Sequence, residues 1–137
     1  MLAPRMLDQQ KSPVVVVEDD DGMRKALDRL LRAAGFQPLL FSSAEAFLGT
    51  DAADVAECLV LDIHLPGLSG LELRRRLMAS GRQPPVIFIT AQDDDASRDE
   101  ARQLNCLAYF RKPFEGAALL EVIRQALSSR PAAKAAH

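Results

Sequence analysis

The chain has 137 residues, which is enough for one domain with a hydrophobic core and too few for two ordinary ones. Hydrophobic residues make up 48% and charged residues 26%, a profile typical of a soluble globular protein and not of a disordered or fibrous one. The formal net charge of -2 argues against a broad electrostatic surface for nucleic acid, so we expect no direct nucleic-acid binding. No apolar run is long enough for a membrane span or a signal-peptide core, which predicts a cytoplasmic protein that does not enter the membrane.

The ends of the chain and its two cysteines indicate the domain organisation. Residues 1–12 read as a flexible N-terminal arm and residues 129–137 as a tail or the start of a linker, so one domain is expected over residues 13–128. Cys58 and Cys106 lie in or beside apolar runs and form neither a CxxC pair nor a cluster with histidine. We expect small buried hydrophobic residues there rather than a disulfide or a zinc site.

Five four-residue apolar runs predict the strands of one sheet. They are rich in branched or aromatic residues and show little polar alternation, which is typical of strands buried on both faces of a parallel sheet. In chain order they are VVVV (14–17), PLLF (38–41), CLVL (58–61), VIFI (86–89) and LAYF (107–110).

The segments between and after these runs carry helical signals. Apolar residues at three- and four-residue steps, ended by Gly35, predict the first helix. Capping-box sequences at 42–45 (SSAE) and 69–72 (SGLE) predict the starts of a short second helix and of a third. The fourth helical segment, 92–105, ends in an asparagine suited to a left-handed terminator and has so few apolar residues that it should be held least firmly. The last, 119–127, has one apolar face.

Strand and helix alternate five times, which predicts an α/β fold with a doubly wound, five-stranded parallel sheet and helices on both faces. Ligands bind such sheets outside the carboxyl ends of the strands, where the strand order reverses. If the order is 2-1-3-4-5, the first and third strands are neighbours at that point.

Reactive side chains follow four of the five predicted strands. Glu18 and Asp19 follow the first strand, Asp62 the third, Thr90 the fourth and Lys112 the fifth. Each alone has an ordinary explanation, because acids after strands commonly cap helices or form turns and a lysine there is usually exposed. Their placement at the same edge of one sheet instead predicts a common site.

These residue types indicate phosphoryl transfer. Three close carboxylates repel one another unless a cation lies among them, and Mg²⁺ suits oxygen ligands beside phosphate. Asp62 can then act as the nucleophile toward phosphorus. The Lys112 ammonium and the Thr90 hydroxyl are suited to contact the phosphoryl oxygens.

Four segments together resemble the receiver family of two-component response regulators, over roughly residues 13–128. They are VVVVEDD, VLDIHLPGLSG, FITAQ and YFRKPFE, at the spacings usual in that family. In amino-acid sequence the chain is similar to receivers that precede helix-turn-helix output domains of the nitrogen-fixation and nitrate-response type. The resemblance implies a flavodoxin-like (βα)5 fold with strand order 2-1-3-4-5.

The resemblance also implies roles for the matching acidic residues. Asp62 accepts a phosphoryl group from a sensor histidine kinase or a phosphotransfer protein. Asp19, Asp62 and the backbone carbonyl of His64 bind Mg²⁺. Glu18, which stands where aspartate is commoner, holds a metal-bound water.

Further roles follow for the switch. Lys112 and Thr90 contact the phosphoryl group, and Tyr109 is the aromatic residue that turns inward when Thr90 moves. The Lys112–Pro113 peptide bond is expected to be cis. The surface that the resemblance implies to change on phosphorylation comprises the fourth helix, the fifth strand and the fifth helix.

Two more positions tune the lifetime of the phosphorylated state in this family. They lie two residues after the acceptor and two after Thr90, and are occupied here by His64 and Gln92. A plain exposed imidazole is an equally good interpretation of His64.

The implied function is a signalling switch that catalyses only its own phosphorylation and dephosphorylation, and not an enzyme with an outside substrate. It would control an output domain or a target protein, and a phosphorylation-dependent dimer is compatible with it. The residues present argue against two other functions. A phosphatase of the haloacid dehalogenase type would have aspartate where this chain has His64. A flavodoxin-like cofactor module would have a hydroxyl- and glycine-rich loop after the first strand, where this chain has acidic residues. A receiver-like module that works by docking alone, without phosphate, stays open.

Overall fold

The computed structural model describes residues 12–128, and the structural statements below refer to them. Apart from residue 12, the predicted arm (1–12) and the predicted tail (129–137) lie outside the described residues. Strands and helices alternate as the sequence predicts, with one additional short helix before the third strand. The elements are β1 (Pro13–Val17), α2 (Asp21–Ala33), β2 (Gln37–Phe41), α3 (Ala44–Leu48), α4 (Ala52–Val55), β3 (Cys58–Asp62), α5 (Gly70–Ala79), β4 (Val86–Thr90), α6 (Asp95–Gln103), β5 (Ala108–Arg111) and α7 (Gly116–Ser128).

The five strands form one parallel sheet in the order β2-β1-β3-β4-β5, which confirms the predicted fold class and strand order. Strands β1 and β3 are neighbours, and Val17 pairs with Leu61. The residues that follow β1 therefore emerge beside Asp62, the last residue of β3. This pairing is the switch point at which doubly wound sheets bind ligands.

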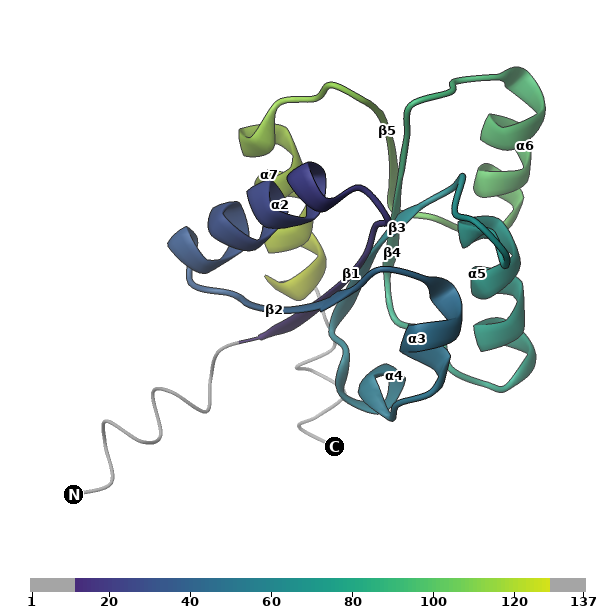
Figure 1. Ribbon diagram of the computed structural model, residues 1–137, viewed down its shortest axis with the longest axis horizontal. Coiled ribbons are helices and arrows are strands. Elements are labelled where there is room, and N and C mark those ends of the chain that lie inside the picture. The colour runs from purple at the N-terminus through teal and green to yellow at the C-terminus, as the bar shows by residue number, and fades with distance from the viewer. Residues whose placement is uncertain (1–11, 129–137) are drawn as a thin grey trace.

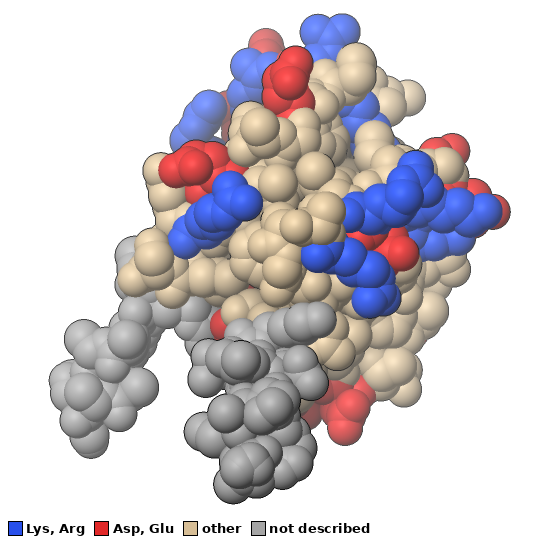
Figure 2. Space-filling model, turned by 90° about the vertical axis from the view of Figure 1, so that its left-hand side faces the viewer, with Lys and Arg blue, Asp and Glu red and all other residues tan. Residues whose placement is uncertain are grey.

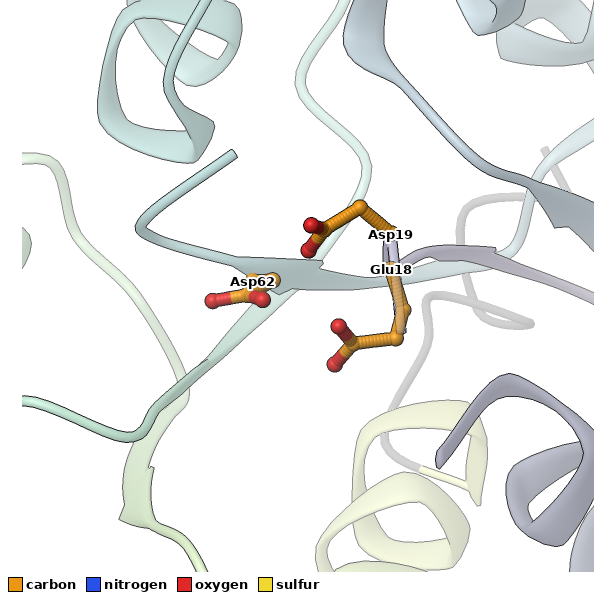
Figure 3. A group of neighbouring side chains, drawn as sticks. All are labelled: Glu18, Asp19 and Asp62. Carbon is orange, nitrogen blue, oxygen red and sulfur yellow. The ribbon is translucent and has the colours of Figure 1, made fainter. Parts of the chain in front are cut away.

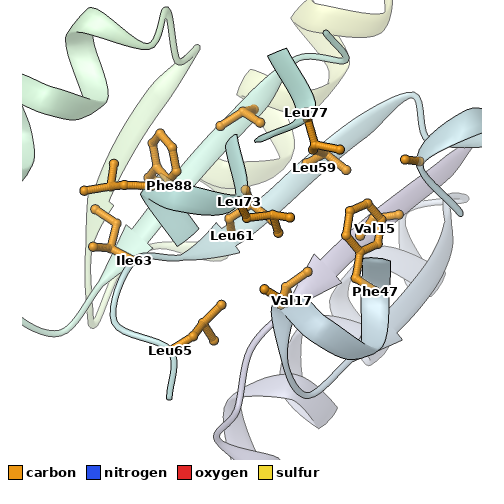
Figure 4. Close-up of a cluster of buried hydrophobic side chains, with 14 of the residues drawn as sticks. Val15, Val17, Phe47, Leu59, Leu61, Ile63, Leu65, Leu73, Leu77 and Phe88 are labelled. Atoms are coloured by element: carbon orange, nitrogen blue, oxygen red, sulfur yellow. The ribbon is translucent and has the colours of Figure 1, made fainter. Parts of the chain in front are cut away.

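Helices cover both faces of the sheet, with α2 and α7 on one side and α3, α5 and α6 on the other (Figure 1). Successive residues of a strand point to opposite faces, so the valines of β1 divide between two clusters. Val14 and Val16 pack with the helices α2 and α7, whereas Val15 and Val17 belong to the cluster beneath α3 and α5 (Figure 4). Because both faces are covered, the central strands read as continuous apolar runs.

The helix ends follow local signals in the sequence. The Asp20 side chain caps α2 by accepting the Met23 N–H at 2.8 Å, and Ser69 caps α5 by accepting the Glu72 N–H at 3.1 Å. Asn105 adopts the predicted left-handed conformation after α6, with φ of 58°. A short polar side chain tolerates this conformation where most residues do not.

The predicted capping box at 42–45 is wrong. Ser43, and not Ser42, caps α3 and accepts the Ala46 N–H at 3.0 Å. Glu45 then lies too early in the helix to reach back to the cap, and it instead accepts the Leu68 N–H at 2.8 Å. The expected short second helix is also followed by a separate turn of helix, α4.

The fourth helical segment is shorter than predicted, because α6 begins at Asp95 after an Asp94 cap, so that Gln92 lies in the preceding loop. Ala101 is its one buried residue, as expected for a weakly held helix. Neither cysteine forms a disulfide; Cys58 is buried as predicted, whereas Cys106 is only half-buried.

The outer surface carries charges of both signs. On the side of α2 and α7, Lys and Arg alternate with Asp and Glu around an uncharged area (Figure 2). Among the helices of residues 12–128, none is long and apolar enough to cross a membrane.

Candidate functional site

Three carboxylates meet at the carboxyl ends of β1 and β3 (Figure 3). Glu18, Asp19 and Asp62 each offer an oxygen within 4.8 Å of the others. Glu18 is 0% exposed and Asp62 is 4% exposed, whereas Asp19 lies at the surface. The site is therefore closed beneath and open toward solvent on the Asp19 side.

Lys112, which follows β5, supplies the positive charge of the site. Its Nζ lies 2.7 Å from Glu18 Oε1 and 3.2 Å from Asp62 Oδ2. The Lys112–Pro113 peptide bond is cis, as predicted. The lysine thus bridges the two buried carboxylates across the sheet edge.

Burial and charge compete in setting the ionisation of this group of side chains. Burial raises the pKa of Glu18 from 4.5 to about 7, although the hydrogen bond from Lys112 lowers it. Burial would lower the pKa of Lys112, but Glu18 and Asp62 outweigh it and raise that pKa. The lysine therefore carries its proton at neutral pH, while Glu18 is poised between its two forms.

The donor set fits a hard divalent cation. All three side chains offer carboxylate oxygens, the ligands that Mg²⁺ prefers. Burial raises the pKa of Glu18, so a cation bound beside this carboxylate would favour its charged form. Asp62 Oδ1 also accepts the His64 N–H at 3.1 Å, which brings the start of the following loop to the site.

A pocket of about 370 Å³ opens over the carboxylates. His64 and Gln92 both line it, so the two predicted lifetime positions do face the proposed acceptor. Thr90 does not line it: its buried hydroxyl donates to the Gln92 carbonyl at 2.8 Å and accepts the Gln92 N–H at 3.0 Å. The complete lining is Glu18, Asp19, Asp20, Met23, Asp62, His64, Ala91, Gln92 and Lys112.

Tyr109 lies apart from the pocket, on the side of α6. The Arg98 guanidinium carbon is 5.5 Å from the centre of the Tyr109 ring, and Arg98 also pairs with Asp93. Burial and the nearby Asp93 carboxylate raise the pKa of the Tyr109 hydroxyl. The two predicted switch residues are thus held by different partners, Thr90 by the loop backbone and Tyr109 by the charges around α6.

Sequence reasoning missed two residues that shape the site. A Cβ on Gly70 would lie 2.2 Å from the Asp62 carbonyl oxygen, so α5 can start against Asp62 only with glycine there. Glu45 holds the loop after Asp62 through Leu68. The glycine beside a helix cap was a usable signal, whereas nothing local connects Glu45 with a loop 23 residues away.

The arrangement suits phosphoryl transfer. It combines a carboxylate able to act as a nucleophile, ligands for a divalent cation and a lysine at hydrogen-bond distance, in a pocket open to a donor. Positioning and electrostatic stabilisation are the main requirements of that reaction.

Comparisons with known proteins agree with this geometry. The family model of the response regulator receiver domain matches residues 14–124. The chain is 36% identical over 133 residues to the response regulator protein TmoT of Ectopseudomonas mendocina, covering 97% of this chain and 60% of TmoT. It is 37% identical over 125 residues to the transcriptional regulatory protein FixJ of Bradyrhizobium diazoefficiens, covering 90% of this chain and 61% of FixJ.

A solved structure, the BeF3-activated DrrB receiver domain, superposes with a TM-score of 0.77 at 28% identity, covering 87% of this chain and 99% of that one. The chain spans about three fifths of the length of the curated relatives TmoT and FixJ. The chain belongs to the response regulator receiver family of two-component systems.

Proposed function

We propose that this chain is a phosphorylation-dependent switch in which Asp62 accepts a phosphoryl group from a sensor histidine kinase or a phosphotransfer protein. The observation that carries the proposal is the meeting of Asp62 with Lys112 and two further carboxylates at one sheet edge. The chain would catalyse only its own phosphorylation and dephosphorylation, so it is a signalling protein and not an enzyme with an outside substrate.

In the proposed reaction an Asp62 carboxylate oxygen attacks the phosphorus of a phosphohistidine. The new O–P bond forms as the P–N bond breaks, and the imidazole leaves with the electron pair. Lys112 Nζ, already 3.2 Å from Asp62 Oδ2, would contact the phosphoryl oxygens. A bound Mg²⁺ would neutralise charge on the transferred group.

The residues proposed to hold Mg²⁺ are those that the family resemblance implies. Asp19, Asp62 and the His64 backbone carbonyl would be ligands, and Glu18 would hold a water of the ion. The cluster of oxygens within 4.8 Å supports this assignment for the three side chains. In the separate dephosphorylation step, water attacks the phosphorus as the O–P bond to Asp62 breaks, which releases inorganic phosphate and restores the Asp62 carboxylate.

The proposed response begins at Thr90. Its hydroxyl would leave the Gln92 backbone and turn toward the phosphoryl oxygens, and Tyr109 would move into the space that it vacates. The face formed by α6, β5 and α7 would then change its contacts. The scarcity of buried residues in α6 supports this choice of moving element.

We also propose a cytoplasmic setting and an output controlled through this face. The output is either a further domain, as in a transcriptional regulatory protein such as FixJ, or a separate target protein. A phosphorylation-dependent dimer through the same face is compatible with the proposal. With a net charge of -2, the chain itself is not proposed to contact nucleic acid.

Incubation with acetyl phosphate and Mg²⁺, followed by intact-mass and peptide mass spectrometry, tests the proposal. We expect one phosphoryl group, on Asp62. After EDTA is added and the donor is diluted, this adduct should disappear only as fast as it is hydrolysed. Asp62→Asn should give no such adduct, and Asp19→Asn should lose both Mg²⁺ binding and phosphorylation. Absence of the adduct from the wild-type chain, with Mg²⁺ bound, would favour the docking module that works without phosphate.

A further inference from the structure

The loop that joins β3 to α5, residues 63–69, connects the proposed acceptor with a proposed metal ligand, and we call it the acceptor loop. Both of its ends are fixed near Asp62. The His64 N–H donates to Asp62 Oδ1 at 3.1 Å, and the Gly70 N–H donates to the Ile63 carbonyl at 3.0 Å. These bonds leave the position of the loop tip, residues 66–68, to other contacts.

Glu45 holds that tip from α3. The Leu68 N–H donates to Glu45 Oε2 at 2.8 Å, across 23 residues of sequence. The same oxygen lies against Gly67, where an added Cβ would come within 2.6 Å of it. In residues 12–128, no other hydrogen bond reaches the loop tip. The fit between the Glu45 carboxylate and this turn is therefore close.

The helix that carries Glu45 is itself firmly anchored. Ser43 caps it, and its Ala44 and Phe47 side chains are completely buried in the core. The hydrogen bond from Leu68 lowers the pKa of Glu45, and the charge of Arg76 lowers it further, so the carboxylate is ionised at neutral pH. The contact is thus a charge-assisted hydrogen bond from a rigid element to a loop.

We infer that Glu45 is a positioning residue of the proposed metal site, which it serves by fixing the acceptor loop and with it the His64 carbonyl. This inference rests on the proposed function, since it assumes that the His64 carbonyl is a ligand. Groups that hold metal ligands in place commonly affect metal affinity without touching the ion. Glu45 touches neither Asp62 nor the pocket, so its effect runs through the loop.

Substitution of Glu45 tests the inference in the whole chain without a phosphoryl donor. Glu45→Ala should speed hydrogen exchange of the Leu68 amide in metal-free protein. It should also weaken Mg²⁺ binding about tenfold, the lower end of the usual range for such residues. Mg²⁺ titrations followed by the amide resonances of His64 and Leu68 measure both. Glu45→Gln retains an oxygen that accepts the Leu68 N–H, and it should restore most of the affinity.

Glu72→Ala is the matched control, because it removes an exposed glutamate from the first turn of α5, beside the same loop, without removing a contact to the tip. It should bind Mg²⁺ as the wild type does. With acetyl phosphate, the Glu45→Ala chain should need more Mg²⁺ for half-maximal phosphorylation but reach the wild-type rate at saturation.

The outcomes separate the inference from the function on which it rests. If the wild-type chain binds Mg²⁺ and Glu45→Ala frees the Leu68 amide yet binds Mg²⁺ equally well, the positioning role is wrong and the proposed function stands. If Glu72→Ala weakened Mg²⁺ binding as much as Glu45→Ala does, the effect would come from the loss of one negative charge near the site. That result would also overturn the inference. A wild-type chain that binds no Mg²⁺ would overturn both.

Discussion

Glu18 is the residue whose ionisation the fold changes most clearly. It follows β1 directly, its side chain is 0% exposed, and it shares the Lys112 ammonium with Asp62. Burial disfavours its charged form more than the lysine favours it, which leaves its pKa near 7. Its folded-state pKa is therefore above the ordinary value of 4.5.

The raised pKa predicts a pH-dependent stability for the metal-free chain. The folded state binds the Glu18 proton more tightly than the unfolded state, so this contribution is complete below pH 4.5 and is lost as the pH rises through about 7. Glu18→Gln removes the titration, and it should gain up to about 3 kcal/mol relative to wild type between pH 5 and pH 8. Urea unfolding in EDTA at several pH values measures this difference. If the difference in free energy of unfolding between Glu18→Gln and the wild type does not change with pH, the prediction is contradicted.

His64 and Gln92 line the pocket over Asp62, where a hydrolytic water must approach. The Gln92 amide can both donate to and accept from such a water, whereas a bulky His64 can shield the acyl phosphate from it. We expect Gln92→Ala to prolong the phosphorylated state and His64→Ala to shorten it or leave it unchanged. Phosphate release after removal of the donor gives both lifetimes. Faster release in Gln92→Ala, or a much longer lifetime in His64→Ala, would be inconsistent with these roles.

Among the elements, α6 stands out because it is charged on most of its surface and contributes one buried residue, Ala101. Its two ends are held differently. Near the N-terminal end, Arg98 pairs with Asp93 and lies over Tyr109. At the C-terminal end, the Leu104 carbonyl accepts a hydrogen bond from Arg74 of α5 at 3.2 Å. The exposed N-terminal contacts are expected to be the easier ones to rearrange.

Phosphorylation should therefore alter α6 and β5 more than the rest of the chain. With beryllium fluoride and Mg²⁺ as a phosphoryl mimic, hydrogen exchange should change across residues 90–111, while the strands β1 and β3 keep their protection. Asp62→Asn with the same additions is the control and should show no change. Equal protection with and without the mimic in the wild-type chain would exclude this switch.

Arg74 connects α5 with the C-terminal end of α6 and with the loop before β4. The side chain is 3% exposed, and it donates to the carbonyls of Leu104 at 3.2 Å and Pro84 at 2.9 Å. Arg74→Ala should lower the free energy of unfolding by about 2–4 kcal/mol, because it leaves a cavity and removes both bonds. The neighbouring Arg75 forms an exposed pair with Glu100, so Arg75→Ala should cost about 1 kcal/mol or less in the same denaturation series.

For the whole molecule, the site lies where segments distant in sequence converge on a buried sheet. Strand order brings Glu18, which follows β1, and Asp62, which ends β3, within hydrogen-bond distance of Lys112 after β5, and this concentrates charge at one edge. The two apolar clusters on either face hold the strands in that order. A cation bound at this edge would therefore stabilise the entire fold and not only a loop.

Mg²⁺ should accordingly raise the thermal midpoint of the chain. At a free concentration about 100 times the dissociation constant, binding to the folded state alone contributes about 2.7 kcal/mol, or roughly 10 °C for a domain of this size. Asp19→Asn should lose this increase while melting normally without metal, since Asp19 is exposed. Differential scanning calorimetry with and without Mg²⁺ tests it, and an equal increase in the variant would argue against Asp19 as a ligand.

The sequence by itself determined the fold class and the sheet, and it identified most residues of the candidate site, because these depend on patterns that are local to each segment. Continuous apolar runs marked the buried strands, and the polar residue after each run marked the edge at which ligands bind. Asp62, Lys112 and the acids after β1 were identifiable because each directly follows a strand or, for Asp62, ends one.

Only the tertiary structure decided contacts made between distant segments and the orientation of side chains in them. Thr90 follows the strand pattern, yet its hydroxyl is engaged by the backbone of its own loop and lies outside the pocket. Glu45 reads locally as part of a helix cap, but it holds a turn 23 residues away because α3 packs beside the acceptor loop. Strand order and helix packing set such distances, and no local propensity encodes them.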